Sequence, residues 1–202
     1  MKKNKVKYGL SNAHYAVEIV GEDGTITYDT PKAWPGSVSL TLSPTGSASS
    51  FYADNALYYT VPGAPGYEGE LESALVPDDF CVDVLGDTLD QEKGILEAGI
   101  PTTKNFALLF QFEGDQKATR HCLYHCSASR PEVSGETVEE STTIGTETLS
   151  FTASARTDTG WVKYPSARMD TGWVKYRTTP DTTDEVYSGW FKKVPIPKTE
   201  EV

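Results

Sequence analysis

The most chemically versatile side chains lie in residues 121–126 (HCLYHC), which hold two histidines and two cysteines. Imidazole and thiolate groups at this short spacing are ligands that zinc prefers in proteins. The apolar residues before the segment indicate a β-strand, on which successive side chains point to opposite faces. His121 and His125 are then expected on one face as exposed imidazoles, and Cys122 and Cys126 on the other as small buried thiols. Because ligands split in this way cannot surround one tetrahedral ion, the spacing argues against a metal site.

Other side chains that support catalysis do not form a recognisable group. Asp78 and Asp79 follow a proline, and this pattern favours the first turn of a helix. Glu139 and Glu140 are expected in a solvated loop. A glycosidase needs two carboxylates that face each other across a cleft, which adjacency in sequence does not supply. The sequence also lacks the common nucleotide-binding, hydrolase, metalloprotease and calcium-binding patterns. We therefore expect neither an enzyme nor a cofactor.

The charge of the chain is strongly acidic and unevenly distributed. The 202 residues carry a net charge of −11, yet the first seven include Lys2, Lys3, Lys5 and Lys7 and no acidic residue. The rest of the chain holds 14 basic and all 29 acidic side chains, a charge of −15. Nucleic-acid binding needs dense lysine and arginine, so this body is a poor binder of DNA or RNA. The basic arm, residues 1–7, is either a solvated start or a contact with a neighbouring copy.

The cysteine count and the hydropathy bear on the redox state of the thiols and on whether the chain enters a membrane. Three cysteines and no apolar signal segment near the start predict reduced thiols in a cytoplasm. No run of 18 apolar residues is present, so no membrane partner is expected.

The dominant hydropathy period is two residues, which predicts a mainly β protein. Asn105–Glu113 and Lys117–Ser127 are expected to pair as the central hairpin, and Asp23 with Gly24 to form a type I′ turn in another. Further strands are expected over 34–42, 67–76 and 143–153, short helices over 77–86 and 182–193, a long loop over 43–66, and an extended or disordered tail over 194–202.

A tandem repeat of 12 residues stands near the end of the chain. Residues 154–165 read SARTDTGWVKYP and residues 166–177 read SARMDTGWVKYR. Because 12 is an even number, either copy fits one strand position with the same face inward. The other copy then loops out, or the two pair as an added hairpin. We interpret the repeat as a local duplication, and we expect a protein without residues 154–165 to fold.

Several segments together resemble one family. These are KVKYGL at 5–10, FYADNALYY at 51–59, GYEGELE at 66–72, LVPDDF at 75–80, KATRHCLY at 117–124, TETLS at 146–150 and VYSGWF at 186–191. In this order they resemble the major tail proteins of long, flexible-tailed phages of Gram-positive bacteria. The resemblance covers nearly the whole chain, and the second copy of the 12-residue repeat departs from it.

The resemblance implies a single domain with a β-sandwich or barrel-like tail-tube fold, flanked by helices. It implies a structural virion protein, assembled in the host cytoplasm into stacked, hexameric rings that form a hollow tube. It also implies contacts with the tape measure protein and with the tail terminator and distal tail proteins, while genomic DNA passes through without specific binding. An acidic lumen suits that passage because it repels phosphate.

Under this interpretation, ring-to-ring contacts are expected from residues 1–7, 43–50 and 194–202. The tyrosines of residues 43–66 are candidates for subunit packing, since tyrosine is enriched at interfaces; the alternative is that they fill the protomer core. The candidate interface residues are Lys2, Lys3, Lys5, Lys7, Ser43, Ser47, Phe51, Tyr52, Tyr58 and Tyr59. The rival function is a small β-sandwich carbohydrate-binding or adhesive module, in which exposed Trp161 and Trp173 stack on sugars.

Overall fold

The computed structural model describes residues 3–61, 63, 66–97, 99–100, 102–135, 137, 144–156 and 172–197. Its strands are β1 (Lys7–Val20), β2 (Ile26–Tyr28), β3 (Lys32–Ala33), β4 (Ser37–Thr45), β5 (Ser49–Ala53), β6 (Ala56–Val61), β7 (Gly66–Ser73), β8 (Thr88–Leu89), β9 (Ile95–Leu96), β10 (Phe106–Gly114), β11 (Thr119–Ala128), β12 (Glu147–Ala153) and β13 (Lys175–Arg177). Its helices are α1 (Asp78–Asp83) and α2 (Asp184–Gly189). The predicted mainly β class is confirmed.

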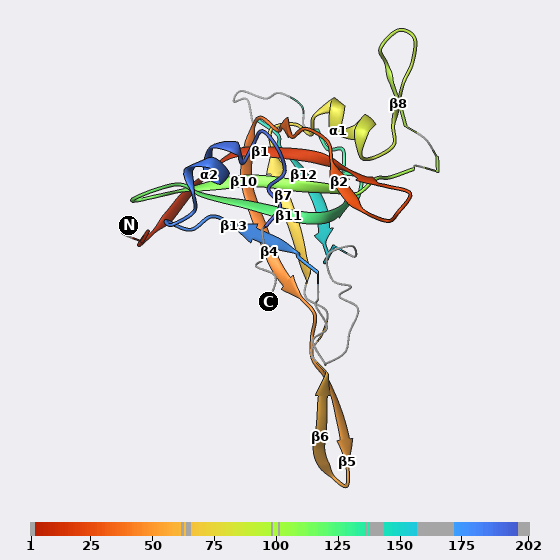
Figure 1. Cartoon of the computed structure of the whole chain (residues 1–202). Coiled ribbons are helices and arrows are strands. Elements are labelled where there is room, and N and C mark those ends of the chain that lie inside the picture. The colour runs from red at the N-terminus through yellow and green to blue at the C-terminus, as the bar shows by residue number, and fades with distance from the viewer. Residues whose placement is uncertain are drawn as a thin grey trace.

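Nine strands form one antiparallel sheet in the order β2-β1-β10-β11-β12-β7-β4, with β3 beside β1 and β13 beside β11. The half with β1, β10 and β11 runs steeply across the half with β12, β7 and β4 (Figure 1). The chain passes from β3, which pairs with β1, directly into β4, which pairs with β7 at the far edge. This connection bridges the two halves, so the sheet curls around one core. The predicted hairpin of β10 and β11 lies at its centre.

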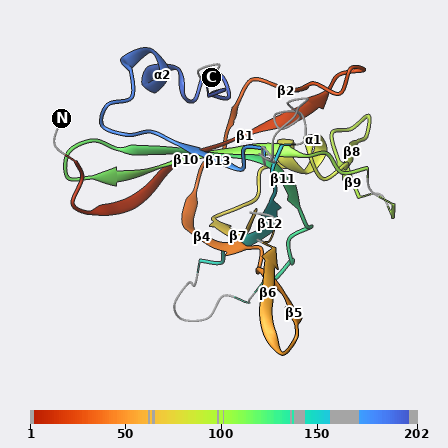
Figure 2. The ribbon, with the colours of Figure 1, turned by 60° about the horizontal axis from the view of Figure 1, so that its bottom comes forward.

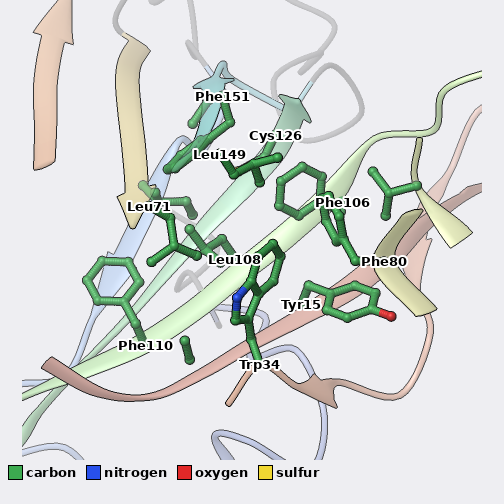
Figure 3. Packing of buried hydrophobic residues seen from close by; sticks show 14 of the residues in the cluster. Tyr15, Trp34, Leu71, Phe80, Phe106, Leu108, Phe110, Cys126, Leu149 and Phe151 are labelled. Atoms are coloured by element: carbon green, nitrogen blue, oxygen red, sulfur yellow. The ribbon is translucent and has the colours of Figure 1, made fainter. Parts of the chain in front are cut away.

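The main core has a cluster of aromatic side chains on one face of the central strands (Figure 3). Tyr15, Trp34, Phe80 and Phe106 are each at most 2% exposed. The Phe80 ring lies 5.1, 4.7 and 5.1 Å from those of Tyr15, Trp34 and Phe106. Phe80 comes from the predicted helix α1, after which Gly86 turns the chain with φ +83°. The aromatic cluster therefore fixes α1 against the sheet.

The opposite face of β10 and β11 is covered by the C-terminal region. Trp190 is fully buried there and donates a hydrogen bond of 3.2 Å from Nε1 to the carbonyl of His121. The predicted helix over 182–193 is shorter than expected, because it ends at Gly189, a residue with little helix propensity. Val194 is 3% exposed, so the start of the predicted tail belongs to the fold; residues 198–202 lie outside the described residues.

The predicted alternation within residues 121–126 fails at a β-bulge. His125 has φ +47°, and β11 carries one extra residue there relative to β10. Cys126 therefore packs in the main core while Cys122 packs on the opposite face, so a common face for the two thiols is wrong although both are buried. The exposed position expected for His121 is also wrong, since it is 8% exposed and stacks on Phe110 with centroids 5.1 Å apart.

The bulge turns His125 toward a buried carboxylate. Its Nδ1 atom lies 3.0 Å from each carboxylate oxygen of Glu18, whose side chain is 1% exposed. Glu18 belongs to β1, so this contact joins β11 to β1 across the intervening β10.

The predicted type I′ turn between β1 and β2 is also wrong. Among the two central residues, only Gly24 has a positive φ, of +81°, whereas a type I′ turn requires two. The amide of Gly24 donates to Gly21, and that of Gly21 to Thr25, at 3.0 and 2.9 Å. The chain thus makes a three-residue hairpin loop with the glycine in the left-handed position.

Strands β12 and β13 occupy successive parts of one position beside β11. β12 pairs with residues 126–128 and β13 with 121–123, in the same antiparallel direction. The chain leaves this position after Ala153 and returns at Val174, which accepts a 2.9 Å hydrogen bond from the amide of Tyr124. The segment between Ala153 and Val174 is thus an insertion into a single strand position, and we call it the excursion.

The excursion is closed at its base by residues of different repeat copies. Arg156 of the first copy donates from its amide to the carbonyl of Trp173 of the second, at 3.1 Å. The Arg156 side chain is 4% exposed and donates to the carbonyl of Ile26 at 2.8 Å. The second copy supplies β13 and so fills the strand position. Residues 157–171 lie outside the described residues, so whether the other copy loops out or pairs as a hairpin stays a prediction.

Candidate assembly surfaces

Residues 43–66, predicted to form a long loop, include a β-hairpin instead. β4 continues to Thr45, and β5 pairs with β6 after a short connection. Asp54 and Asn55 form the turn with φ of +51° and +59°, as a two-residue type I′ turn requires. Both residue types tolerate this left-handed conformation, and that is the signal in the sequence that marks the hairpin.

The β5–β6 hairpin extends away from the rest of the protein in both views (Figures 1 and 2). Its strands form a separate two-stranded sheet. Asp54 is its only charged residue, and its large apolar side chains are exposed: Phe51 60%, Tyr52 66%, Leu57 56%, Tyr58 73% and Tyr59 64%. A lone two-stranded hairpin is at best marginally stable in water, and contiguous exposed apolar surface marks an interaction site. The hairpin is therefore a surface suited to being covered by a partner.

The alternative that these tyrosines fill the protomer core is wrong. The hairpin's one ring contact among the described residues is between Phe51 and Tyr58, whose centroids are 6.3 Å apart in an edge-on arrangement. The two rings meet at the bulge, where the register of β5 and β6 shifts between Phe51 and Tyr52. The aromatic side chains thus contact one another and leave most of their surface in solvent.

The two candidate serines lie on either side of the end of β4. Ser43 is exposed within β4 opposite Glu68, and Ser47 is exposed in the connection to β5. They belong to the base of the hairpin rather than to one flexible loop.

The basic arm is held against its own protomer. Lys2 lies outside the described residues, and Lys3, Lys5 and Lys7 are exposed. The side chain of Asn4 donates to the carbonyl of Lys117 at 2.6 Å and accepts from its amide at 3.1 Å. The amide of Lys5 donates to Asp115 at 2.7 Å. These contacts hold the arm, with its exposed lysines, against the β10–β11 turn. The sequence gives no local signal for this role of Asn4.

A basic cavity adjoins the arm, and its composition was not predicted. It has a volume of about 620 Å³ and is lined by Lys5 and Lys7 of the arm together with Lys175 and Arg177 of β13. The last two residues belong to the repeat, so their nearness to the arm depends on the fold and has no local signal in the sequence.

The structure gives less support to the tryptophans as sugar platforms. Trp173 is partly buried and packs against the cluster that contains Trp190. Trp161 lies outside the described residues. Stacking on a sugar needs an open ring face, which packing at Trp173 reduces.

The thiols and carboxylates show no catalytic arrangement in the described part of the chain. Cys81, Cys122 and Cys126 are not in disulfides, and burial raises the pKa of the Cys122 and Cys126 thiols. No group of three or more histidine, cysteine, aspartate or glutamate side chains converges there to hold a metal ion. No described helix is long and apolar enough to cross a membrane. No protein-family model matches the chain, and no curated protein sequence is significantly similar to it.

Proposed function

We propose that this chain is a structural virion protein whose copies assemble into stacked, hexameric rings that form the tail tube of a long, flexible-tailed phage. The observation that carries the proposal is the β5–β6 hairpin, which presents aromatic side chains away from the body on a segment that resembles the tail protein family. A self-assembling protein needs such a surface, because its stability in the assembly depends on covering it.

The energetic scale of this surface fits assembly. An aromatic side chain offers about 200 Å², and Phe51, Tyr58 and Tyr59 are 60%, 73% and 64% exposed. Covering about 130 Å² on each contributes about 3 kcal/mol per side chain at about 25 cal/mol/Å². The three together reach about 9 kcal/mol, which is of the same order as the roughly 4–15 kcal/mol entropic cost of association.

The charge fits the proposed passage of DNA. With a net charge of −11 per copy, a tube of this protein has an acidic surface that repels phosphate, so DNA moves through without specific binding. The tape measure protein inside, and the terminator and distal tail proteins at the two ends, are the further partners under this proposal.

Electron microscopy of the concentrated, purified protein tests the proposal. We expect hollow rods or stacked rings. A Tyr58→Ser variant should raise the protein concentration needed for assembly about 30- to 160-fold, the equivalent of about 2–3 kcal/mol per contact. The matched control is Leu75→Ser, which removes a side chain that is 68% exposed outside the hairpin and should assemble like the wild type.

Protomer stability separates this effect from misfolding. Because Tyr58 is mostly in solvent, its substitution should change the free energy of unfolding by no more than about 0.5 kcal/mol. Persistent monomers at every concentration, together with binding to glycans on an array, would overturn the tail-tube proposal in favour of the carbohydrate-binding module.

A further inference from the structure

The basic cavity joins two parts of the chain that are distant in sequence. Arg177 pairs in register with His121, and Lys175 pairs two residues further along β11. Lys7 begins β1 at the other side of the cavity, opposite Gly114. Strand pairing therefore fixes where these cations lie, so that the basic cavity is part of the folded protomer.

Two aromatic rings hold lysines of the cavity in place. The Nζ atom of Lys7 lies 4.8 Å from the ring centroid of Phe112, and that of Lys175 lies 5.0 Å from that of Tyr67. Such contacts attract an ammonium to the ring face without neutralising it. The two contacts thus place both ammonium groups beside the cavity.

In the described part of the chain, the cations of the cavity lack a carboxylate within ion-pair distance. Among the described residues, none of Lys5, Lys7, Lys175 and Arg177 forms an ion pair with a carboxylate, and no acidic side chain lines the cavity. Burial and then the like charges of Lys7 and Arg177 lower the pKa of Lys175. A bound anion would reduce the repulsion between the cations that line the cavity.

A buried histidine adds a second, independent observation. His121 also lines the cavity, is 8% exposed, and its Nδ1 atom has no hydrogen-bond partner in the described structure. Buried polar atoms are nearly always paired in native proteins. An unpaired ring nitrogen next to unpaired cations indicates a site that is completed by a bound group.

We infer that the basic cavity binds a carboxylate-bearing segment of a second copy of this chain and thereby joins neighbouring subunits. This inference rests on the proposed self-assembly. Four of the 18 basic residues line the cavity, which leaves 14 basic and 29 acidic residues elsewhere. Any other surface of a second copy is thus on average acidic, and complementary charge favours its approach.

Nucleic acid fits the cavity less well than an acidic peptide. Binding along a DNA or RNA backbone uses an extended basic surface that contacts many phosphates. Here the cations converge on a cavity of about 620 Å³, within a chain of net charge −11. That volume admits a few carboxylate side chains, and the surrounding acidic surface repels a long polyanion.

The inference is tested with a double variant, Lys175→Glu with Arg177→Glu, against a matched control, Lys104→Glu with Lys192→Glu, which makes the same change in charge at exposed sites away from the cavity. Fluorescence anisotropy of a labelled hexaglutamate peptide measures binding to the protomer. We expect the cavity variant to bind the peptide at least 10-fold more weakly than the wild type and the control to bind it within about 2-fold. Raising NaCl from 50 to 500 mM should weaken wild-type binding steeply.

Assembly is measured in parallel by sedimentation velocity and electron microscopy. The cavity variant should need at least a 10-fold higher concentration to assemble, while the control assembles normally. Normal assembly of the cavity variant, or tighter binding of a 12-nucleotide DNA than of the peptide, overturns the inference and leaves the tail tube untouched. Absence of any wild-type assembly despite peptide binding that depends on the cavity refutes the tail tube alone and supports the carboxylate site.

Discussion

Deletion of residues 154–165 should leave a folded protein that is more stable than the wild type. The deletion joins Ala153 to Ser166, and residues 166–168 repeat the sequence Ser-Ala-Arg of 154–156. Arg168 then stands where Arg156 closes the base of the excursion with the carbonyl of Trp173. Every residue type that the structure uses at the base is preserved.

The magnitude follows from the length of the closed loop. In the wild type, 16 residues, 157–172, separate Arg156 from Trp173, and the deletion leaves the four residues 169–172 between Arg168 and Trp173. The entropic cost of closure scales as (3/2)RT ln n, so this fourfold shortening stabilises the fold by about 1.2 kcal/mol. For a protein of this size, that corresponds to a rise in Tm of about 2–5 °C. A four-residue loop is also a common hairpin connection.

Urea unfolding followed by tryptophan fluorescence, with thermal unfolding beside it, provides the assay. Two matched variants test whether Arg168 takes the place of Arg156 after the deletion: Arg156→Ala in the full chain, and Arg168→Ala in the deleted chain. Both should lose similar stability, about 1–3 kcal/mol, because each removes the buried hydrogen bond to the carbonyl of Ile26. A deleted protein that is destabilised by more than about 1 kcal/mol, or that fails to fold, refutes the account of the excursion as an extended loop.

Three further changes test the packing of the body. Burial and neighbouring cations hold the pKa of His121 at about 4 against 6.5 when unfolded; only the unfolded chain gains this proton as the pH falls between those values. The free energy of unfolding should therefore drop by about 3 kcal/mol over that window, and His121→Gln should remove this part of the slope in urea titrations. Gly69→Ala places a Cβ against the buried ring of Phe151 and should cost about 1–3 kcal/mol in thermal unfolding; an unchanged Tm contradicts it. Arg130→Ala removes a 2.8 Å ion pair to the buried Asp87 and should speed proteolysis within residues 87–97, whereas an unaltered cleavage rate argues against that role.

The central hairpin and α1 were predictable because local and global signals agree there. Alternating apolar side chains in Asn105–Glu113 match a strand that is buried on the core side, and Pro77 with two aspartates matches a helix start. At the β5–β6 hairpin, by contrast, the hydropathy pattern does not indicate the strands that form. Both of its faces carry aromatic side chains, so no alternation of polar and apolar residues marks it as a strand pair.

The bulge and the basic cavity could not be predicted from local patterns. A bulge inserts one residue without a change in composition, and His125 follows the same spacing that a regular strand has. The cavity combines Lys5 and Lys7 with Lys175 and Arg177, which are more than 160 residues apart in the chain. The pairing of β1 with β10, of β10 with β11 and of β11 with β13 brings them together, and the repeat leaves open which copy supplies β13.

The contact between Glu18 and His125 has a consequence for how the chain selects its strand alignment. A slip of β11 by one residue against β10 moves the imidazole away from Glu18, whose side chain is 1% exposed. The slip removes the closest partner of this buried carboxylate and leaves it the 3.5 Å hydrogen bond from the Tyr28 hydroxyl, and a buried carboxylate that loses a partner costs free energy or must take up a proton. Misaligned sheets are thus penalised at a single position, even where their apolar side chains still find hydrophobic neighbours. The contact between His125 and Glu18 at the bulge thus stabilises one alignment of the central strands relative to alignments that are shifted by one residue.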